Sequence, residues 1–349
     1  MVATTTQPPP GTYRPPSDLY PFTSRWLTID GQRMHYLDEG PRDAPVLLML
    51  HGNPTWSFYY RNLVLRLRDR YRCIVPDHIG CGLSDKPEDS EYDYHLARRI
   101  DDLDALVRAA VGDEAPLSLI AHDWGGMIGF GWATARAQRI KSCVILNTAA
   151  FPLPADKRFP FALWLAGRTR LGALLVRGMN AFSAMAAWIA FKKPVSKAVR
   201  AAYTGPYNSW KNRIATVRFV QDIPLKPSDR GYDLVAGTAG RLHRLADTPA
   251  LLVWGLRDFV FDQSFYRVWQ RYLPKAQRCP LADCGHYVLE DGGEPLLDRI
   301  EAFLASVECH AEHQTRSAGA SSGEGQTTAA GHAQITGENA AGNDRSAAS

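Results

Sequence analysis

The sequence predicts an α/β fold with a mostly parallel, doubly wound sheet and a helical cap inserted after the sixth strand. Apolar runs rich in β-branched and aliphatic residues alternate with stretches of helical period, which is typical of a parallel sheet covered on both faces. One long segment, residues 151–240, interrupts this alternation. The chain has 349 residues, of which 45% are hydrophobic and 22% charged, so it can bury a sizeable core.

The first two strands are predicted to form a hairpin. The runs RWLTID (25–30) and RMHYLD (33–38) flank Asp30-Gly31, a pair that favours the tight turn of antiparallel strands. The later strands are expected at VLLMLHG, RCIVPD, LSLIAHD, SCVILNT, LLVWG and QRCPLAD. Helical period over Tyr94–Ala110 and Gly125–Ala137 predicts two of the helices that cover the sheet.

Composition divides the chain into a core, a cap and two ends. Residues 20–150 and 241–308 are assigned to the α/β core, and 151–240 to the helical cap. Residues 1–19 are rich in Pro and Thr, and 309–349 in Gly, Ala, Ser and Thr. Such segments bury too little apolar surface to offset their ordering entropy, so both ends are predicted to be disordered. The second end is either a solvated terminus or a linker.

The cap segment leaves several interpretations open. Its Trp, Met and Phe residues either form the core between helices or wall a site for a lipophilic substrate. Leu163–Ile189 is also amphipathic enough for contact with a membrane surface.

Charge and motifs exclude several classes of function. A net charge of +4 gives no electrostatic footprint for nucleic acid. The sequence shows neither a signal peptide nor a run of about 18 apolar residues, so a cytoplasmic protein without a membrane span is expected. The six cysteines form no C-x-x-C pair or His/Cys cluster, and neither a zinc site nor a disulfide framework is predicted. No metal or other cofactor is expected.

Three residues that follow predicted strands could carry chemistry. In a doubly wound sheet, ligands bind outside the carboxyl ends of the strands. Asp123 follows LSLIAH and precedes Trp124 and two glycines, in the outline of a nucleophile elbow that usually holds a serine. Asp258 follows LLVWGLR, and His286 lies in DCGHYVLED. Nucleophile, acid and histidine occur in this order in the triads of α/β-hydrolases.

An aspartate nucleophile suits a particular class of target. With an ordinary pKa of about 3.9 it is ionised at neutral pH and needs no base to activate it. Attack on an sp³ carbon of a haloalkane, an epoxide or a strained lactone gives a covalent ester. Water activated by a histidine can open that ester, a role that His286 fits when Asp258 fixes its tautomer.

Other residues at the strand ends are alternatives or auxiliaries. Asp262 competes with Asp258 as the acid, whereas Asn147, at another strand exit, cannot be one. The backbone amides of Asn53 and Trp124 are expected to form the oxyanion site, and the two side chains offer N–H donors for an anionic leaving group. Ordinary core packing is the alternative role of Trp124.

Several phrases together resemble a known family. They are HGNPTW, PDHIGCGLSDKP, HDWGGMIGFGWA, GLRDFVFD and GHYVLED, which look like the haloalkane dehalogenase branch of the α/β-hydrolases. With LNTAAFP and PYNSWKNRIATVRFVQDIPL, the chain most closely resembles the β-lactone decarboxylases of bacterial long-chain olefin biosynthesis. The resemblance extends from about Tyr20 to Val307.

The resemblance implies roles for individual residues. It makes Asp123 the nucleophile, His286 the histidine and Asp258 the acid. Asn53 and Trp124 match the halide-holding pair of the dehalogenases. Arg257 is expected to meet the carboxyl group of the lactone. The list of expected substrate-binding residues is therefore Asn53, Trp124 and Arg257.

The resemblance also implies a reaction and partners. The expected substrate is a cis-β-lactone with two long alkyl arms, converted to a cis-alkene and carbon dioxide through an ester or anhydride of Asp123. Hydrolytic dehalogenation, or related epoxide or ester hydrolysis, is the first alternative, and a non-catalytic module that recruits pathway enzymes is the second. Assembly with, or fusion to, a β-lactone synthetase is implied as well.

Overall fold

The computed structural model describes residues 4–9 and 11–323, and its centre is a nine-stranded sheet. The order across the sheet is β1-β2-β3-β5-β4-β6-β7-β8-β9. The strands are β1 (Thr4–Thr5), β2 (Arg25–Ile29), β3 (Gln32–Glu39), β4 (Val46–Leu50), β5 (Arg72–Pro76), β6 (Leu117–Asp123), β7 (Ile140–Thr148), β8 (Ala250–Gly255) and β9 (Gln277–Leu281). The pairs from β5 to β9 are parallel, and those among β1, β2, β3 and β5 are antiparallel.

The predicted hairpin is confirmed. Strands β2 and β3 pair antiparallel from Ile29↔Gln32 onward, so Asp30 and Gly31 make the turn. Both residues have positive φ, 46° and 82°, the conformation that a two-residue turn of this kind requires and that glycine and aspartate tolerate. All eight strands expected from the sequence are present, and β1 is the additional one.

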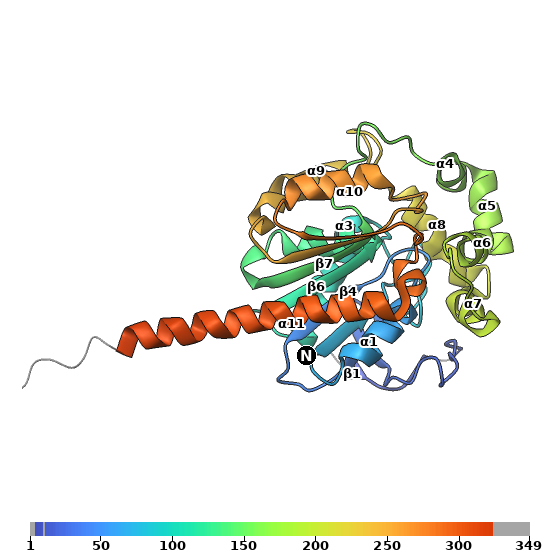
Figure 1. Ribbon diagram of the computed structural model, residues 1–349. Coiled ribbons are helices and arrows are strands. Elements are labelled where there is room, and N and C mark those ends of the chain that lie inside the picture. Colours follow the sequence, from blue (N-terminus) through green and yellow to red (C-terminus); the bar gives the residue numbers. More distant parts are fainter. Residues whose placement is uncertain (1–3, 10, 324–349) are drawn as a thin grey trace, which may run out of the picture. The chain divides into compact units, whose positions relative to one another are not determined.

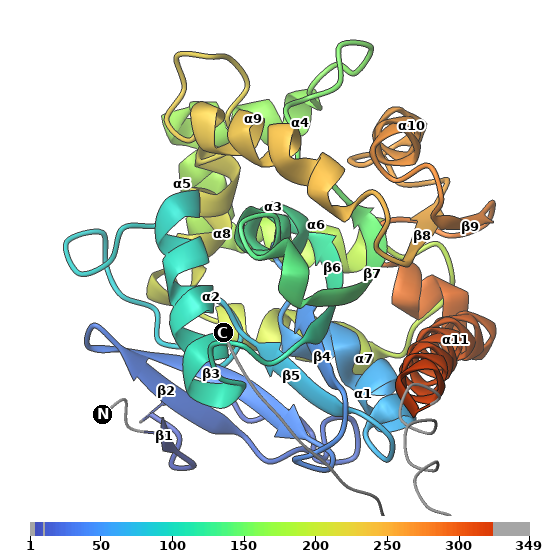
Figure 2. The ribbon, with the colours of Figure 1, turned by 90° about the vertical axis from the view of Figure 1, so that its left-hand side faces the viewer.

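Helices cover both faces of the sheet, as the doubly wound prediction requires (Figure 2). The helices of the sheet layers are α1 (Arg61–Leu67), α2 (Leu96–Ala110), α3 (Trp124–Ala133), α9 (Tyr232–Arg241), α10 (Gln263–Tyr272) and α11 (Val288–Gly323). Along β4, Leu48 and Leu50 share a core with α2, α3, α9 and α10. Leu47 and Met49, on the opposite face, pack with α1 and α11. Successive side chains of β4 thus point to opposite faces of the sheet and pack in two separate apolar layers.

A helical cap connects β7 to the rest of the chain (Figure 1). Its helices are α4 (Phe161–Arg168), α5 (Arg170–Met179), α6 (Ala181–Ile189), α7 (Lys197–Thr204) and α8 (Ile214–Gln221). Five short 3₁₀ helices complete the elements: η1 (Ser57–Tyr60), η2 (Ala137–Arg139), η3 (Gly205–Tyr207), η4 (Lys211–Arg213) and η5 (Leu242–Leu245). The insertion follows the sixth of the eight strands expected from the sequence.

The boundary of the cap differs from the predicted residue 240. Helix α9 packs against α3, and its Val235 and Ala239 belong to the same apolar layer as Leu48 and Leu50 of β4. The sequence assigned α9 to the cap because the segment is helical in character and no strand returns to the sheet until Leu251. Cap and sheet lie in one compact unit, Met1–Val307, and Glu308–Ser349 form a second unit.

The two ends differ from the disorder predicted for residues 1–19 and 309–349. Strand β1 pairs with β2, and Tyr13 packs edge-on against Trp56. Backbone pairing and one aromatic contact thus order residues that composition alone assigned to a flexible end. Helix α11 continues to Gly323, with a kink at Gly293. Residues 324–349 of the predicted tail lie outside the described residues. Within residues 4–9 and 11–323, no helix is long and apolar enough to cross a membrane.

Candidate active site

Asp123 lies at the junction of β6 and α3, in a sharp strand-to-helix turn. Its backbone has φ 51° and ψ −125°, a conformation that costs energy for any residue except glycine. Two glycines, which have no Cβ, allow the neighbouring segments to approach this turn closely. A Cβ on Gly52 would lie 1.9 Å from Asp123 Oδ1, and one on Gly125 would lie 2.0 Å from the carbonyl oxygen of Leu50. The elbow predicted from the sequence is therefore present, with aspartate at its tip.

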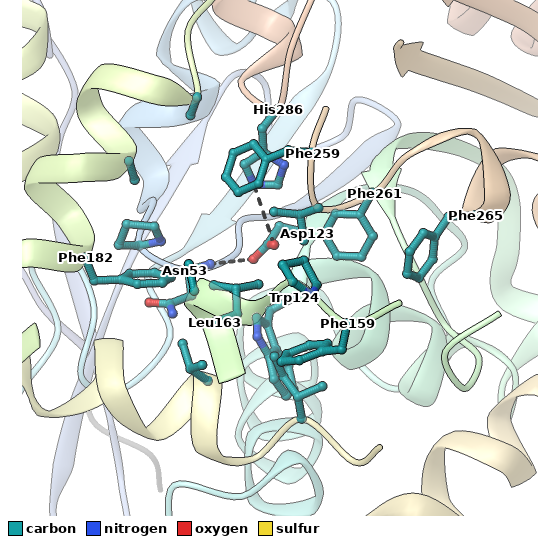
Figure 3. Close-up of a pocket in the computed structure, with 18 of the residues that line it drawn as sticks. Asn53, Asp123, Trp124, Phe159, Leu163, Phe182, Phe259, Phe261, Phe265 and His286 are labelled. Carbon is teal, nitrogen blue, oxygen red and sulfur yellow. Dashed lines mark hydrogen bonds and ion pairs between the residues drawn. The ribbon is translucent and has the colours of Figure 1, made fainter. Parts of the chain in front are cut away.

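Hydrogen bonds fix one side of the Asp123 carboxylate. The backbone N–H of Asn53 donates to Oδ1 over 2.6 Å, and the backbone N–H of Trp124 also bonds the carboxylate. The hydroxyl of Thr148 donates to the backbone carbonyl of Asp123. The two amides predicted to form an oxyanion site thus hold the carboxylate itself. Oδ2 lies on the side of His286, 3.6 Å from Nε2. This geometry makes Oδ2 the oxygen available for attack (Figure 3).

His286 and Asp258 complete the arrangement expected for a triad. His286 Nδ1 lies 2.8 Å from Asp258 Oδ2, so the carboxylate fixes the N–H on Nδ1 and directs Nε2 toward Asp123. Phe261 stacks on the imidazole, with ring centroids 5.9 Å apart and planes inclined by 15°. All three polar side chains are buried.

Asn147 positions the acid. Its Nδ2 donates to Asp258 Oδ2 over 3.0 Å and to the carbonyl of Gly255, and its Oδ1 accepts from the Gly255 N–H over 2.8 Å. The backbone N–H of Val260 donates to the other oxygen, Asp258 Oδ1, over 2.8 Å. Asn147, which cannot itself be an acid, therefore orients Asp258, the residue predicted to be the acid.

Replacing Asn147 with alanine is expected to lower kcat about 10- to 100-fold, because Asp258 loses the donor that fixes the oxygen facing His286. The free energy of unfolding should fall by about 1–3 kcal/mol, since buried groups lose their partners. Ser142→Ala is the matched control, because Ser142 is buried on the same strand and bonds Ser118 far from the site. Equal kcat in the two variants would contradict the positioning role of Asn147.

Burial and neighbouring charges change the pKa of both reacting groups. Burial raises the pKa of Asp123, against the lowering influence of His286 and of the two amides. Burial alone would lower the pKa of His286, but the carboxylates of Asp258 and Asp123 outweigh it and raise the pKa. The two carboxylates therefore stabilise the protonated form of His286 relative to the neutral imidazole.

Asp123 and His286 line a cavity of about 320 Å³ between the sheet and the cap (Figure 3). That volume lies within the range of small-molecule sites. Most lining side chains are apolar. They come from the β7–α4 connection, α4, α6, α8, the loop after β8 and α10, and they include Phe151, Phe159, Leu163, Phe182, Met185, Ile189, Val220, Phe259, Phe261 and Phe265. The cavity thus presents one polar reacting centre inside an apolar chamber.

The structure places the other predicted residues in different settings. The Asn53 side chain lines the cavity, but its Nδ2 donates to the carbonyl of Thr216 on α8 over 3.1 Å. Trp124 also lines the cavity and packs on Phe219, with ring centroids 5.1 Å apart. The indole of Trp124 therefore serves both the cavity wall and core packing.

Arg257 is not among the residues that line the cavity, and its contact with a substrate carboxyl group stays a prediction. Its side chain is exposed. The neighbouring Asp258 is directed inward to His286, which leaves Arg257 on the outside of the turn. Asp262, the competing acid, binds Lys157 Nζ over 2.7 Å and caps α10, so it is not part of the triad.

Sequence reasoning missed Lys157, a cationic residue of the cavity lining. Its Nζ is held by Asp262 and by the carbonyl of Phe259, so it ties the β7–α4 connection to the loop after β8. A single lysine in a proline-rich connection has no recognisable pattern. Lys157 reaches the cavity because the fold places the β7–α4 connection beside the loop after β8.

The chain matches the family model of the α/β hydrolase fold over residues 45–293. It belongs to the α/β hydrolase family. The chain is 53% identical to the cis-3-alkyl-4-alkyloxetan-2-one decarboxylase of Shewanella oneidensis over 291 residues, which cover 83% of this chain and 91% of that protein. It is 50% identical to the protein of the same name from Xanthomonas campestris pv. campestris, with 82% and 97% covered.

Solved structures give the same assignment. This α/β hydrolase superimposes on haloalkane dehalogenase DbeA from Bradyrhizobium elkani with a TM-score of 0.74 and 26% identity, covering 82% of this chain and 98% of that one. The resemblance to the haloalkane dehalogenase branch that the sequence phrases indicated is thereby confirmed.

Proposed function

We propose that this enzyme decarboxylates a cis-3,4-dialkyl β-lactone to a cis-alkene and carbon dioxide. The observation that carries the proposal is an aspartate nucleophile at the base of an apolar chamber, in a chain about half identical to two proteins named as decarboxylases of such oxetanones. The phenylalanine-rich wall suits two alkyl arms, because burial of apolar surface would supply the binding free energy.

The chemistry can be written without water. Asp123 Oδ2 attacks C4 of the lactone, and the C4–O bond breaks to give an ester on C4 and a free carboxylate on C3. Loss of carbon dioxide from C3 then supplies the electron pair of the C3=C4 double bond and expels the Asp123 carboxylate. Inversion at C4 followed by anti elimination is a net syn loss, which converts a cis lactone into a cis alkene.

His286 is assigned an electrostatic role in this scheme. The carboxylates that raise its pKa favour the imidazolium, which stabilises the carboxylate developing on the ring oxygen. A protonated imidazole cannot take a proton from water. The same side chain would have to be neutral to hydrolyse an ester, so the two functions require opposite protonation states of His286.

The pH dependence of kcat/KM for the lactone is expected to be bell-shaped. Asp123 must be ionised for attack, so activity should fall as the pH is lowered. Because the pKa of Asp123 is raised, the midpoint of this acid limb should lie above the ordinary carboxyl value of 3.8. His286 must be protonated, and because its pKa is raised, the alkaline decline should lie above 6.5. Alkene formation measured across this range tests both limbs. A rate that increases through the alkaline region would contradict the imidazolium role.

Hydrolytic dehalogenation is the second candidate. Trp124 and Asn53 line the cavity and match the halide-holding pair of the dehalogenase resemblance, although Asn53 Nδ2 is already bonded to the carbonyl of Thr216. Incubation with a long-chain cis-β-lactone and, separately, with 1-haloalkanes decides between the two. Alkene without halide release supports decarboxylation, whereas halide release without alkene would overturn it.

Partners and location remain predictions. Assembly with, or fusion to, a β-lactone synthetase is implied by the family resemblance. The low-complexity composition of residues 309–349 resembles the start of a linker, and most of these residues lie outside the described ones. A purely recruiting, non-catalytic role is disfavoured by the complete triad. The cytoplasmic location stays an expectation from the sequence.

A further inference from the structure

The outer surface of the cap carries large apolar side chains in contact with solvent. We define the apolar cap face as Phe161, Trp164, Leu171, Leu174, Leu175, Met179, Met185, Trp188 and Ile189, all exposed and all on α4, α5 and α6. Three of them, Phe161, Met179 and Trp188, are more than 70% exposed. Outside the cap, Leu65 and Phe259 are the exposed large hydrophobics among the described residues.

The helices present these side chains as stripes. On α5, Leu171, Leu174 and Leu175 follow the spacing of one helical face, whereas Gly172 and Val176 are buried. On α6, Met185, Trp188 and Ile189 repeat the pattern. Figure 1 shows these helices on the side of the cap away from the strands. Exposed apolar side chains gathered on neighbouring helices indicate an interaction site.

The charged side chains of the cap segment between Asp156 and Asp222 are all basic. Between Asp156 and Asp222 the sequence contains twelve lysines and arginines and no aspartate or glutamate. Some of them pair with acidic residues of the core, as Lys157 does with Asp262. Arg158, Arg170, Lys192 and Lys197 are exposed, and none of them makes an ion pair within residues 4–9 and 11–323. Exposed basic residues therefore flank the apolar stripes along the chain.

The apolar cap face borders the reaction chamber. Met185 and Ile189 are exposed and also line the cavity that contains Asp123. Leu163, on α4 between Phe161 and Trp164, lines the same cavity. A molecule held against this face therefore has an apolar route toward the nucleophile.

We propose that the apolar cap face docks on the surface of an anionic lipid bilayer. Exposed aromatic and aliphatic side chains with basic residues beside them are the features of helices that lie in a membrane interface. Lysines and arginines near such a surface gain free energy from anionic headgroups. A second copy of this chain is a poorer occupant, because its matching face would bring like charges together.

Sedimentation with lipid vesicles tests the proposal. The protein should bind vesicles of phosphatidylcholine with about 30% phosphatidylglycerol at least about tenfold more strongly than vesicles of phosphatidylcholine alone. Raising NaCl to about 0.5 M should reduce that difference by screening. The variant Leu171→Ser/Leu174→Ser/Trp188→Ser should bind at least about tenfold more weakly, because it removes buried apolar area at the interface. These three side chains do not line the cavity.

Leu65→Ser is the matched control, since Leu65 is exposed on α1 outside the cap and its variant should bind like the wild type. Absence of vesicle binding by the wild type, or unchanged binding by the triple variant, would overturn the proposal. A dimer that the triple variant abolishes, without vesicle binding, would assign the face to self-association instead. Vesicle binding requires no turnover, so its failure is separable from failure of the proposed reaction.

Discussion

Replacing Asp123 with asparagine is expected to lower the rate of alkene formation by about 10⁴-fold. The amide retains an oxygen that can accept the Asn53 N–H bond, so the elbow should keep its shape. It has no negative charge and is a poor nucleophile, so no ester can form on it. The measurement is kcat with a synthetic cis-β-lactone.

Two controls separate loss of chemistry from loss of structure. The melting temperature of the Asp123→Asn variant should equal or exceed that of the wild type, because burial disfavours the ionised form of Asp123. Asp262→Asn changes an aspartate of the adjoining loop that pairs with Lys157, and it should keep activity within a few-fold. Substantial turnover by the Asp123→Asn variant would refute covalent catalysis.

Gly125→Ala is expected to impair both stability and activity. Its Cβ would lie 2.0 Å from the carbonyl oxygen of Leu50 and 3.0 Å from that of His51, both backbone atoms at the end of β4. Since neither can move independently of the sheet, α3 would have to shift. Overpacking of this kind costs about 3 kcal/mol of unfolding free energy. Displacement of the Trp124 amide should lower kcat by about 100-fold.

Gly131→Ala is the matched control on the same helix. The new Cβ would meet the Cδ1 of Ile100 at 2.5 Å, the end of a flexible side chain that can change rotamer. Chemical denaturation and kcat should therefore be affected much less than in Gly125→Ala. Similar losses in the two variants would show that the close approach of α3 to β4 does not determine the geometry of the elbow.

Much of the fold was predictable because its signals are local. Alternation of apolar runs with helical periods identified the sheet, and Asp30-Gly31 identified the hairpin. The triad was predictable because strand ends meet at one edge of a parallel sheet. Asp123, Asp258 and His286 each follow such an end, so their order along the chain indicated their proximity.

What the sequence did not reveal depends on contacts between distant segments. The direction of Arg257 is set by its neighbour Asp258, which turns inward to His286. Lys157 gains its place from Asp262, more than a hundred residues away. Helix α9 follows the cap with no strand between them, and only its packing on α3 assigns it to the sheet layer. The order of residues 4–9 and 11–19 likewise depends on pairing with β2 and packing on Trp56.

The most direct test of the central claim is the product formed from a long-chain cis-β-lactone in ¹⁸O-labelled water. Nucleophilic attack by Asp123 followed by loss of carbon dioxide predicts a cis-alkene in an amount equal to the lactone consumed, with no hydroxy acid. An ¹⁸O-labelled β-hydroxy acid as the main product would contradict this account. It would mean that His286 activates water and that the enzyme is a hydrolase.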